Sequence, residues 1–140
     1  TGFRTERGLL KAIDGVSFYV EKGEILGVVG ESGCGKSVTS QTILRLYDEK
    51  YTAKHDGEVI FDGKDILHIP EKEMEKIRGN SISMVFQDAL SSLNPTFTVG
   101  YQLRETLMIH QGMSKKEADK KAVEMLRLVG IPAPERRIKQ

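Results

Sequence analysis

The feature that most constrains this chain is a glycine-rich motif at residues 30–37. These residues read Gly-Glu-Ser-Gly-Cys-Gly-Lys-Ser and match the pattern G-x-x-x-x-G-K-[ST] at every fixed position. The preceding residues 25–29 are apolar at successive positions, which is typical of a strand covered on both faces in a parallel sheet. Residues 36–46 suit a helix. The sequence therefore predicts a strand–loop–helix unit within an α/β fold.

The spacing of the motif suits a loop that wraps a phosphate group. Such a loop aims several backbone N–H groups inward, and that curvature is easiest where side chains are absent. Lys36 can then reach the β and γ phosphates, the Ser37 hydroxyl can ligate Mg²⁺, and the helix presents its positive end to the anion. The alternative is a glycine-rich surface turn beside a solvated lysine. The strand before the motif and the helix after it favour the phosphate loop.

Local patterns predict the other elements. Alternation predicts a strand at residues 16–20, and short apolar runs predict strands at 57–61 and 82–86, the first of these followed by an Asp62-Gly63 turn. Pro70 and the carboxylates after it predict a helix start, and Gly79 ends that helix. One further helix is expected at about 99–110. Another begins at a capping box, Ser114 with Glu117, and ends near Gly130.

Composition excludes several classes of protein. The chain has 140 residues, 39% of them hydrophobic, with 21 Lys and Arg against 20 Asp and Glu, so the net charge of +1 gives no electrostatic case for nucleic acid. The longest uncharged run, 89–103, contains Asn94, Pro95 and Gly100, which argues against a membrane span. One cysteine and no visible signal peptide make a reducing, cytoplasmic setting the default.

Two further segments indicate a family. The predicted strand 82–86 leads into Gln87-Asp88, and Ser-Leu-Asn-Pro follows at 92–95. Together with Val-Gly-Glu-Ser-Gly at 29–33, these segments resemble the ATP-binding subunits of ABC transporters, in the branch of oligopeptide, dipeptide and nickel importers. Gln87 occupies the place of that family's Q-loop. The Asn-Lys-x-Asp sequence by which GTPases usually recognise guanine does not occur.

The resemblance implies binding and hydrolysis of ATP with Mg²⁺ to drive import of peptides or a related solute. Lys36 and Gln87 are then the catalytic residues, with Gln87 sensing the γ-phosphate, and Ser37 and Gln87 are the metal ligands. Phe3 would stack on adenine, although a frayed or core-packed terminal Phe is the alternative. The predicted nucleotide-binding residues are Phe3, Gly30, Glu31, Ser32, Gly33, Cys34, Gly35, Lys36, Ser37 and Val38.

The resemblance also implies an incomplete P-loop NTPase of the ABC ATPase type. Residues 1–97 would form the N-terminal part of the ATP-binding core, with the Walker A unit, a small antiparallel β part and the Q-loop strand. Residues 98–140 would begin the helical subdomain. The signature motif, the Walker B strand with its catalytic Glu and the switch His do not occur in these residues. The chain alone is therefore expected to be inactive and to lack strand partners for 25–29 and 82–86.

The expected partners are a membrane permease, contacted through the Q-loop and helical subdomain at the inner face of the membrane, and a second ATP-binding subunit. Self-association through the unpaired strands is also expected. The alternatives are a fragment that binds nucleotide or a partner without hydrolysis, and a non-transport ABC ATPase. Ala89 stands where many relatives have Pro, Cys34 is expected to be no nucleophile, and His55, His68 and His110 are expected to be solvated.

Overall fold

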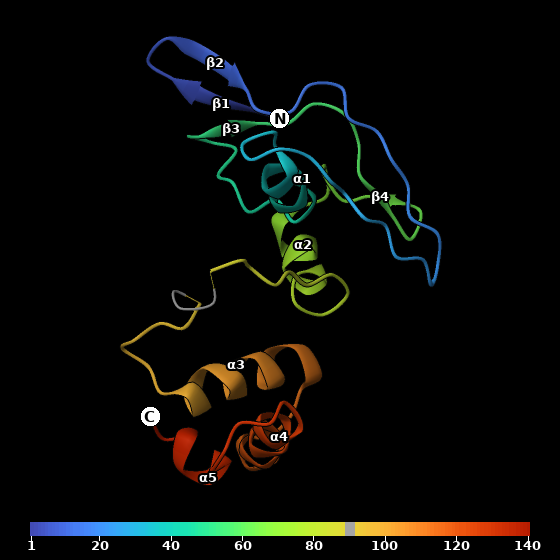
Figure 1. The fold of residues 1–140 in the computed structure, drawn as a ribbon. Coiled ribbons are helices and arrows are strands. Elements are labelled where there is room, and N and C mark those ends of the chain that lie inside the picture. The colour runs from blue at the N-terminus through green and yellow to red at the C-terminus, as the bar shows by residue number, and fades with distance from the viewer. Residues whose placement is uncertain (89–91) are drawn as a thin grey trace. The chain divides into compact units, whose positions relative to one another are not determined.

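The computed structural model describes residues 1–88 and 92–140, which divide into two compact units, Thr1–Glu75 and Lys76–Gln140 (Figure 1). Ala89 and the start of the predicted loop 89–95 lie outside the described residues. The predicted boundary between an ATP-binding core, residues 1–97, and a helical subdomain, residues 98–140, stays a prediction.

A three-stranded antiparallel sheet of order β2-β1-β3 lies in the N-terminal unit. It consists of β1 (Gly2–Thr5), β2 (Gly8–Lys11) and β3 (Ala53–Lys54). Gly8 has φ of +115°, a conformation that glycine adopts without steric cost, and it closes the turn between β1 and β2. The small antiparallel β part is thus confirmed. Strands at 2–5 and 8–11 were not predicted.

A second, two-stranded sheet follows in β4 (Ile60–Phe61) and β5 (Lys64–Asp65). Asp62 and Gly63 both have positive φ, as a type I′ hairpin turn requires, so the predicted turn is confirmed. Helices α1 (Lys36–Ile43) and α2 (Glu71–Ile77) also begin in this unit. Its buried apolar side chains are those of Leu44, Ala53, Ile66, Leu67 and Met74.

The predicted strands at 16–20, 25–29 and 82–86 are wrong for the described structure. Those residues form no ladder there beyond one parallel bridge between Arg78 and Ile82. Ile25, Val29 and Val85 are exposed to 96%, 93% and 96%. The physical reason is that a strand exists only with a hydrogen-bonding neighbour, and no described segment supplies one to these residues.

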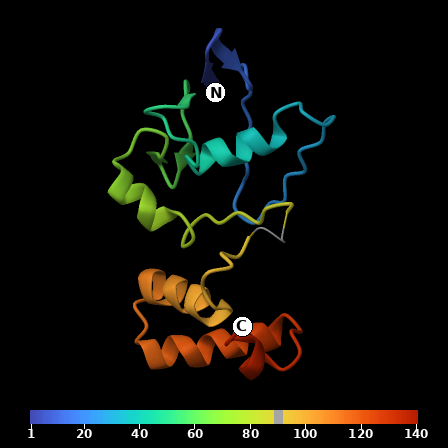
Figure 2. The same ribbon diagram turned by 90° about the vertical axis from the view of Figure 1, so that its left-hand side faces the viewer.

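The C-terminal unit contains α3 (Val99–Gln111), α4 (Lys115–Leu128) and the short α5 (Pro134–Arg137) (Figure 2). Helices α3 and α4 pack through a small core of Leu107, Ala118 and Ala122. Arg104 of α3 also pairs with Asp119 of α4 at 2.7 Å. The two longer helices and the Ser114–Glu117 capping box are confirmed.

Helix α3 begins against the end of the chain. The backbone N–H groups of Val99 and Gly100 donate to the carbonyls of Gln140 and Ile138, at 2.7 and 2.8 Å. Gly100 permits this close approach, because a Cβ there would lie 2.6 Å from the Ile138 carbonyl oxygen. Thr98 accepts a further bond from the Tyr101 N–H and caps the helix. The first backbone N–H groups of α3 therefore have hydrogen-bond partners within the protein.

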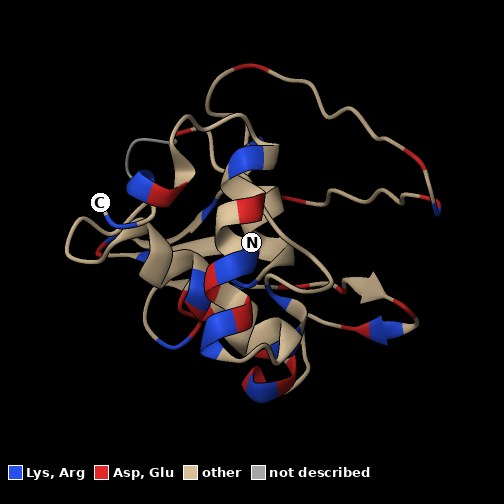
Figure 3. Ribbon diagram, turned by 90° about the horizontal axis from the view of Figure 1, so that it is seen from below, with Lys and Arg blue, Asp and Glu red and all other residues tan. Residues whose placement is uncertain are grey.

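Charges of both signs occur on α2, α4 and α5, and several helical segments in Figure 3 carry both blue and red, whereas the charged residue of α1 is Lys36. No helix in the described part of the chain combines the length and the apolar character needed to cross a bilayer.

Candidate functional site

The glycine-rich loop is bent rather than extended. The Cys34 N–H donates to the Glu31 carbonyl at 3.3 Å, which turns the chain back on itself. Gly33 and Gly35 have φ of +82° and +99°, in the range that side chains rarely adopt. Gly35 is the residue that caps α1, so the helix begins directly at Lys36. The loop therefore has the curvature that enclosing an anion requires.

Lys36 folds its side chain back onto this loop. Its ammonium Nζ donates to the Gly30 carbonyl at 2.6 Å and to the Glu31 carbonyl at 2.7 Å, and it lies 3.6 Å from Cys34 Sγ. Gly30 leaves room for the Cys34 sulfur, because a Cβ on Gly30 would lie 2.6 Å from it. The positive charge is thus held against the backbone of the bent loop, and the role of Lys36 at phosphates stays a prediction.

The end of the loop lies close to the segment that follows β2. A Cβ on Gly35 would lie only 2.9 Å from the carbonyl oxygen of Ala12, which directly follows β2. The N–H groups of Ala12 and Ile13 both donate to the Thr1 carbonyl at 3.0 Å. On the helix side, Thr39 Oγ1 donates to the Gly35 carbonyl at 3.0 Å. Gly35 therefore has no room for a side chain next to Ala12, and its carbonyl is bonded by Thr39 on the helix side.

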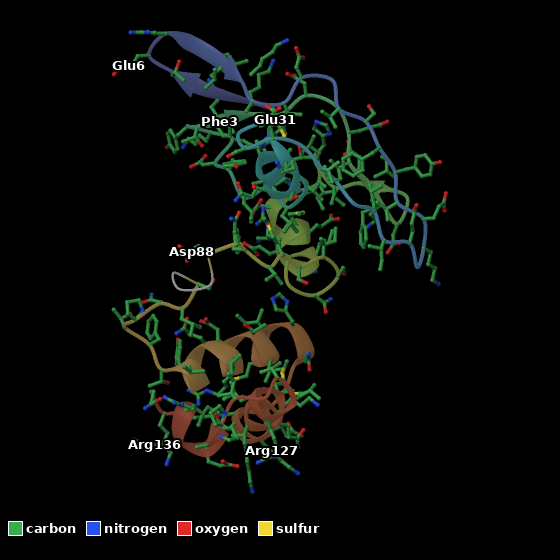
Figure 4. All side chains as sticks on the ribbon, viewed as in Figure 1. Phe3, Glu6, Glu31, Asp88, Arg127 and Arg136 are labelled. Atoms are coloured by element: carbon green, nitrogen blue, oxygen red, sulfur yellow. The ribbon has the colours of Figure 1, made fainter. Side chains whose placement is uncertain are left out.

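Phe3 is half-buried on β1, and its place in a strand rules out the frayed terminus considered from sequence. Its ring forms a T-shaped pair with Tyr47, with the ring centroids 4.8 Å apart and the planes at 81°. Figure 4 labels Phe3 on the strand and Glu31 of the loop, both within the N-terminal unit. Sequence reasoning missed Tyr47, which has no motif to mark it.

The remaining predicted site residues are placed as follows. Glu31, Ser32 and Ser37 are exposed, and Val38 is half-buried in the first turn of α1. Gln87 is exposed next to Asp88, which Figure 4 labels, and it belongs to the C-terminal unit. The structure thus brings together the residues of the loop, with Phe3 in the same unit. The role of Gln87 stays a prediction.

The expectation of three solvated histidines is wrong for His110, which is half-buried, and for His55. His55 is half-buried, its Nδ1 lies 3.0 Å from Thr1 Oγ1, and its Nε2 is buried with no hydrogen-bond partner among the described residues. Burial lowers the pKa of His55 below its ordinary value, because the charged imidazolium is poorly solvated there. His68 is exposed and bonds Asp65, which lowers the Asp65 pKa. In the described residues no cluster of His, Cys, Asp or Glu could hold a metal ion.

Comparison with known proteins adds to this geometry. Residues 13–140 match the family model described as ABC transporter. The chain is 51% identical over 138 residues to the oligopeptide transport ATP-binding protein OppD of Bacillus subtilis (strain 168), covering 99% of this chain and 38% of that protein. It is 54% identical over 139 residues to the dipeptide transport ATP-binding protein DppD of the same organism, covering 99% and 41%. The chain thus spans about two fifths of the length of these curated relatives.

Proposed function

This chain belongs to the ABC transporter family, and on that premise we propose that it is part of an ATP-binding subunit that powers the import of peptides. The observation that carries the proposal is the bent loop 30–35 with the Lys36 ammonium held over two of its carbonyls. In the nucleotide-bound form, a glycine-rich loop of this kind aims backbone N–H groups at a phosphate, and Lys36 already places a positive charge beside the loop. That combination suits the terminal phosphates of a nucleotide.

The roles of the residues follow from their chemistry. Lys36 exchanges the carbonyls of Gly30 and Glu31 for phosphate oxygens, which are better partners because they are charged. The start of α1 adds its positive dipole end. Ser37 and Gln87 offer a hydroxyl and an amide oxygen, which are hard oxygen ligands suited to Mg²⁺. When bound, Mg²⁺ neutralises charge on the β and γ phosphates.

Phe3 is assigned to the adenine base. The half-burial of its ring and its place on a strand that belongs to the same unit as the loop support this role. Aromatic side chains bind bases by stacking, which adds affinity without requiring a hydrogen-bond pattern. Glu31, Ser32, Gly33, Cys34, Gly35 and Val38 complete the nucleotide site through their backbones.

Membership of an ATPase family supports ATP hydrolysis by the intact subunit. We assign that hydrolysis to a longer protein, in which residues 25–29 and 82–86 pair with further strands. The exposure of Ile25, Val29 and Val85 supports this assignment, because long apolar side chains gain from burial. A second ATP-binding subunit and a permease at the inner membrane face are the proposed partners. The 140-residue chain alone binds nucleotide without turnover and associates with itself through these segments.

The test is isothermal titration of the chain with Mg-ATP, comparing Lys36→Ala with the exposed control Lys22→Ala. Loss of a charge-assisted contact in a partly buried site is worth about 2 to 3 kcal/mol, or about 30- to 150-fold in affinity. Lys22→Ala should match the parent chain. Equal affinities for the parent and Lys36→Ala would contradict the proposed site, and so would a parent chain that takes up no ATP. Steady ATP turnover by the chain alone would contradict the assignment of hydrolysis to a longer protein.

A further inference from the structure

We propose that Tyr47 is a positioning residue that sets the orientation of the Phe3 ring for a nucleotide base and ties it to helix α1. This inference rests on the proposed nucleotide site. The ring pair of Phe3 and Tyr47 is the observation that carries it.

The sheet by itself holds the Phe3 ring weakly. Phe3 lies directly opposite Leu10 of β2 and Ala53 of β3, and directly opposed residues share one face of an antiparallel sheet. Ala53 is small, and Leu10 is 62% exposed. Neither cross-strand neighbour therefore encloses the ring. Tyr47, from the segment after α1, supplies the aromatic contact instead.

The geometry of the pair leaves room for a base. In a T-shaped pair, one ring presents its edge to the face of the other. If Phe3 presents its edge, Tyr47 covers neither of its faces, and if Phe3 presents a face, the opposite face is not covered by Tyr47. In both cases Tyr47 fixes the plane of Phe3 and leaves at least one face clear of itself. A parallel stack between the two rings would have competed more directly with a base.

Tyr47 is itself anchored to the helix that starts at the phosphate loop. Its hydroxyl donates to Oε1 of Gln41 on α1, and the Leu46 N–H donates to the Gln41 carbonyl at 3.0 Å. Burial raises the pKa of Tyr47 above its ordinary value, which agrees with a neutral hydroxyl donating this bond. Since α1 begins at Lys36, one helix connects the residue for the phosphates with the residue that orients Phe3.

This arrangement predicts a selective effect on ligands that carry a base. The chain would be titrated with Mg-ATP and with Mg-tripolyphosphate, which has the phosphates but no base. Tyr47→Leu should weaken ATP binding about threefold to tenfold, the range expected for losing an ordered aromatic contact. It should leave tripolyphosphate binding within about twofold. Tyr47→Phe keeps the ring and should bind ATP more tightly than Tyr47→Leu.

A spectroscopic variant gives a second readout. The chain contains no tryptophan, so Phe3→Trp introduces a single fluorophore at the proposed stacking position. Added ATP should change its emission and tripolyphosphate should not. Combining Phe3→Trp with Tyr47→Leu should reduce the amplitude of the ATP response at saturation.

The outcomes separate the two proposals. Equal loss of ATP and tripolyphosphate binding in Tyr47→Leu would show that Tyr47 only supports the fold, and unchanged ATP binding would show that it does not orient Phe3. Either result overturns the role of Tyr47 while leaving the phosphate site in place. If Lys36→Ala leaves tripolyphosphate binding unchanged, or if the parent chain binds neither ligand, the proposed function fails and the role of Tyr47 fails with it.

Discussion

Two glycines of the glycine-rich loop 30–35 should differ sharply in their tolerance of alanine. Gly33 and Gly35 both have positive φ, so either substitution places a side chain in a strained backbone conformation. Their surroundings differ. A Cβ at position 33 meets no atom within 4 Å, whereas a Cβ at position 35 would lie 2.9 Å from the Ala12 carbonyl oxygen. Gly33→Ala is therefore an internal control for the contact made at Gly35.

The expected loss of stability is the sum of two costs, one for the positive φ and one for the close contact with the Ala12 carbonyl. Positive φ in a residue other than glycine costs about 1 to 2 kcal/mol, and both variants pay this cost. Forcing an extra carbon into a close contact costs about 1 to 3 kcal/mol, and only Gly35→Ala pays it. The expected losses of unfolding free energy are thus about 1 to 2 kcal/mol for Gly33→Ala and about 2 to 5 kcal/mol for Gly35→Ala. The partner atom belongs to the backbone, so no substitution at Ala12 relieves the contact.

Urea denaturation followed by circular dichroism measures this difference. The midpoint should fall further for Gly35→Ala, with the slope of free energy against urea unchanged in both variants. Nucleotide affinity should follow the same order, because displacement of the Ala12 carbonyl moves the start of α1 and with it Lys36. Equal midpoints for the two variants would refute the idea that contact with Ala12 holds the loop.

Three further predictions concern packing, capping and pH. Leu107→Ala in the core of the helical unit should cost about 2 to 5 kcal/mol, whereas Ile109→Ala, at a side chain 69% exposed, should change the urea midpoint little. Ser114→Ala should cost about 1 kcal/mol at pH 7. Hydrogen bonds from the Ser114 hydroxyl and N–H lower the Glu117 pKa in the folded chain. The Glu117 carboxylate therefore stabilises the fold at pH values above its unfolded pKa, and this stabilisation is lost as the pH falls through its folded pKa. Urea denaturation should show that the difference in unfolding free energy between the parent and Ser114→Ala is smaller at pH 3 than at pH 7. Because the pKa of His55 is lowered in the folded chain, His55 binds a proton at a higher pH when the chain is unfolded. The free energy of unfolding should therefore decline as the pH falls below about 6.5. His55→Gln should flatten that decline between pH 7 and 5.

The helices could be predicted from sequence because their signals are local. The Ser114 hydroxyl and the Glu117 carboxylate that satisfy the first N–H groups of α4 lie within one turn of each other. Gly112, with φ of +62°, ends α3 in the same local manner. Such signals do not depend on any distant part of the chain. The same holds for the Asp62-Gly63 turn between β4 and β5.

The strands could not be predicted in this way, because each depends on a partner elsewhere in the sequence. Residues 25–29 have a strong apolar pattern and form no ladder in the described structure, whereas β1 and β2 have weak patterns and pair in full register. Gly8, which begins β2 directly after the turn at Glu6 and Arg7, was a sequence signal for β1 and β2. β3 contributes two residues to that sheet from more than forty positions away, and no pattern in it indicates this pairing.

In the candidate site, too, local features could be predicted from the sequence and contacts with distant residues could not. The bend of the loop arises within residues 30–35, so the motif was sufficient to predict it, whereas the bonds of the Lys36 ammonium to the Gly30 and Glu31 carbonyls were not predicted. The supports of the loop come from outside the motif. Ala12 limits position 35 to glycine, and Tyr47 contacts the ring of Phe3. A loop with the same eight residues but no backbone segment packed next to Gly35 would not have this restriction on side-chain size at position 35. The motif therefore specifies the chemistry of the site, and residues distant from it in sequence specify its rigidity.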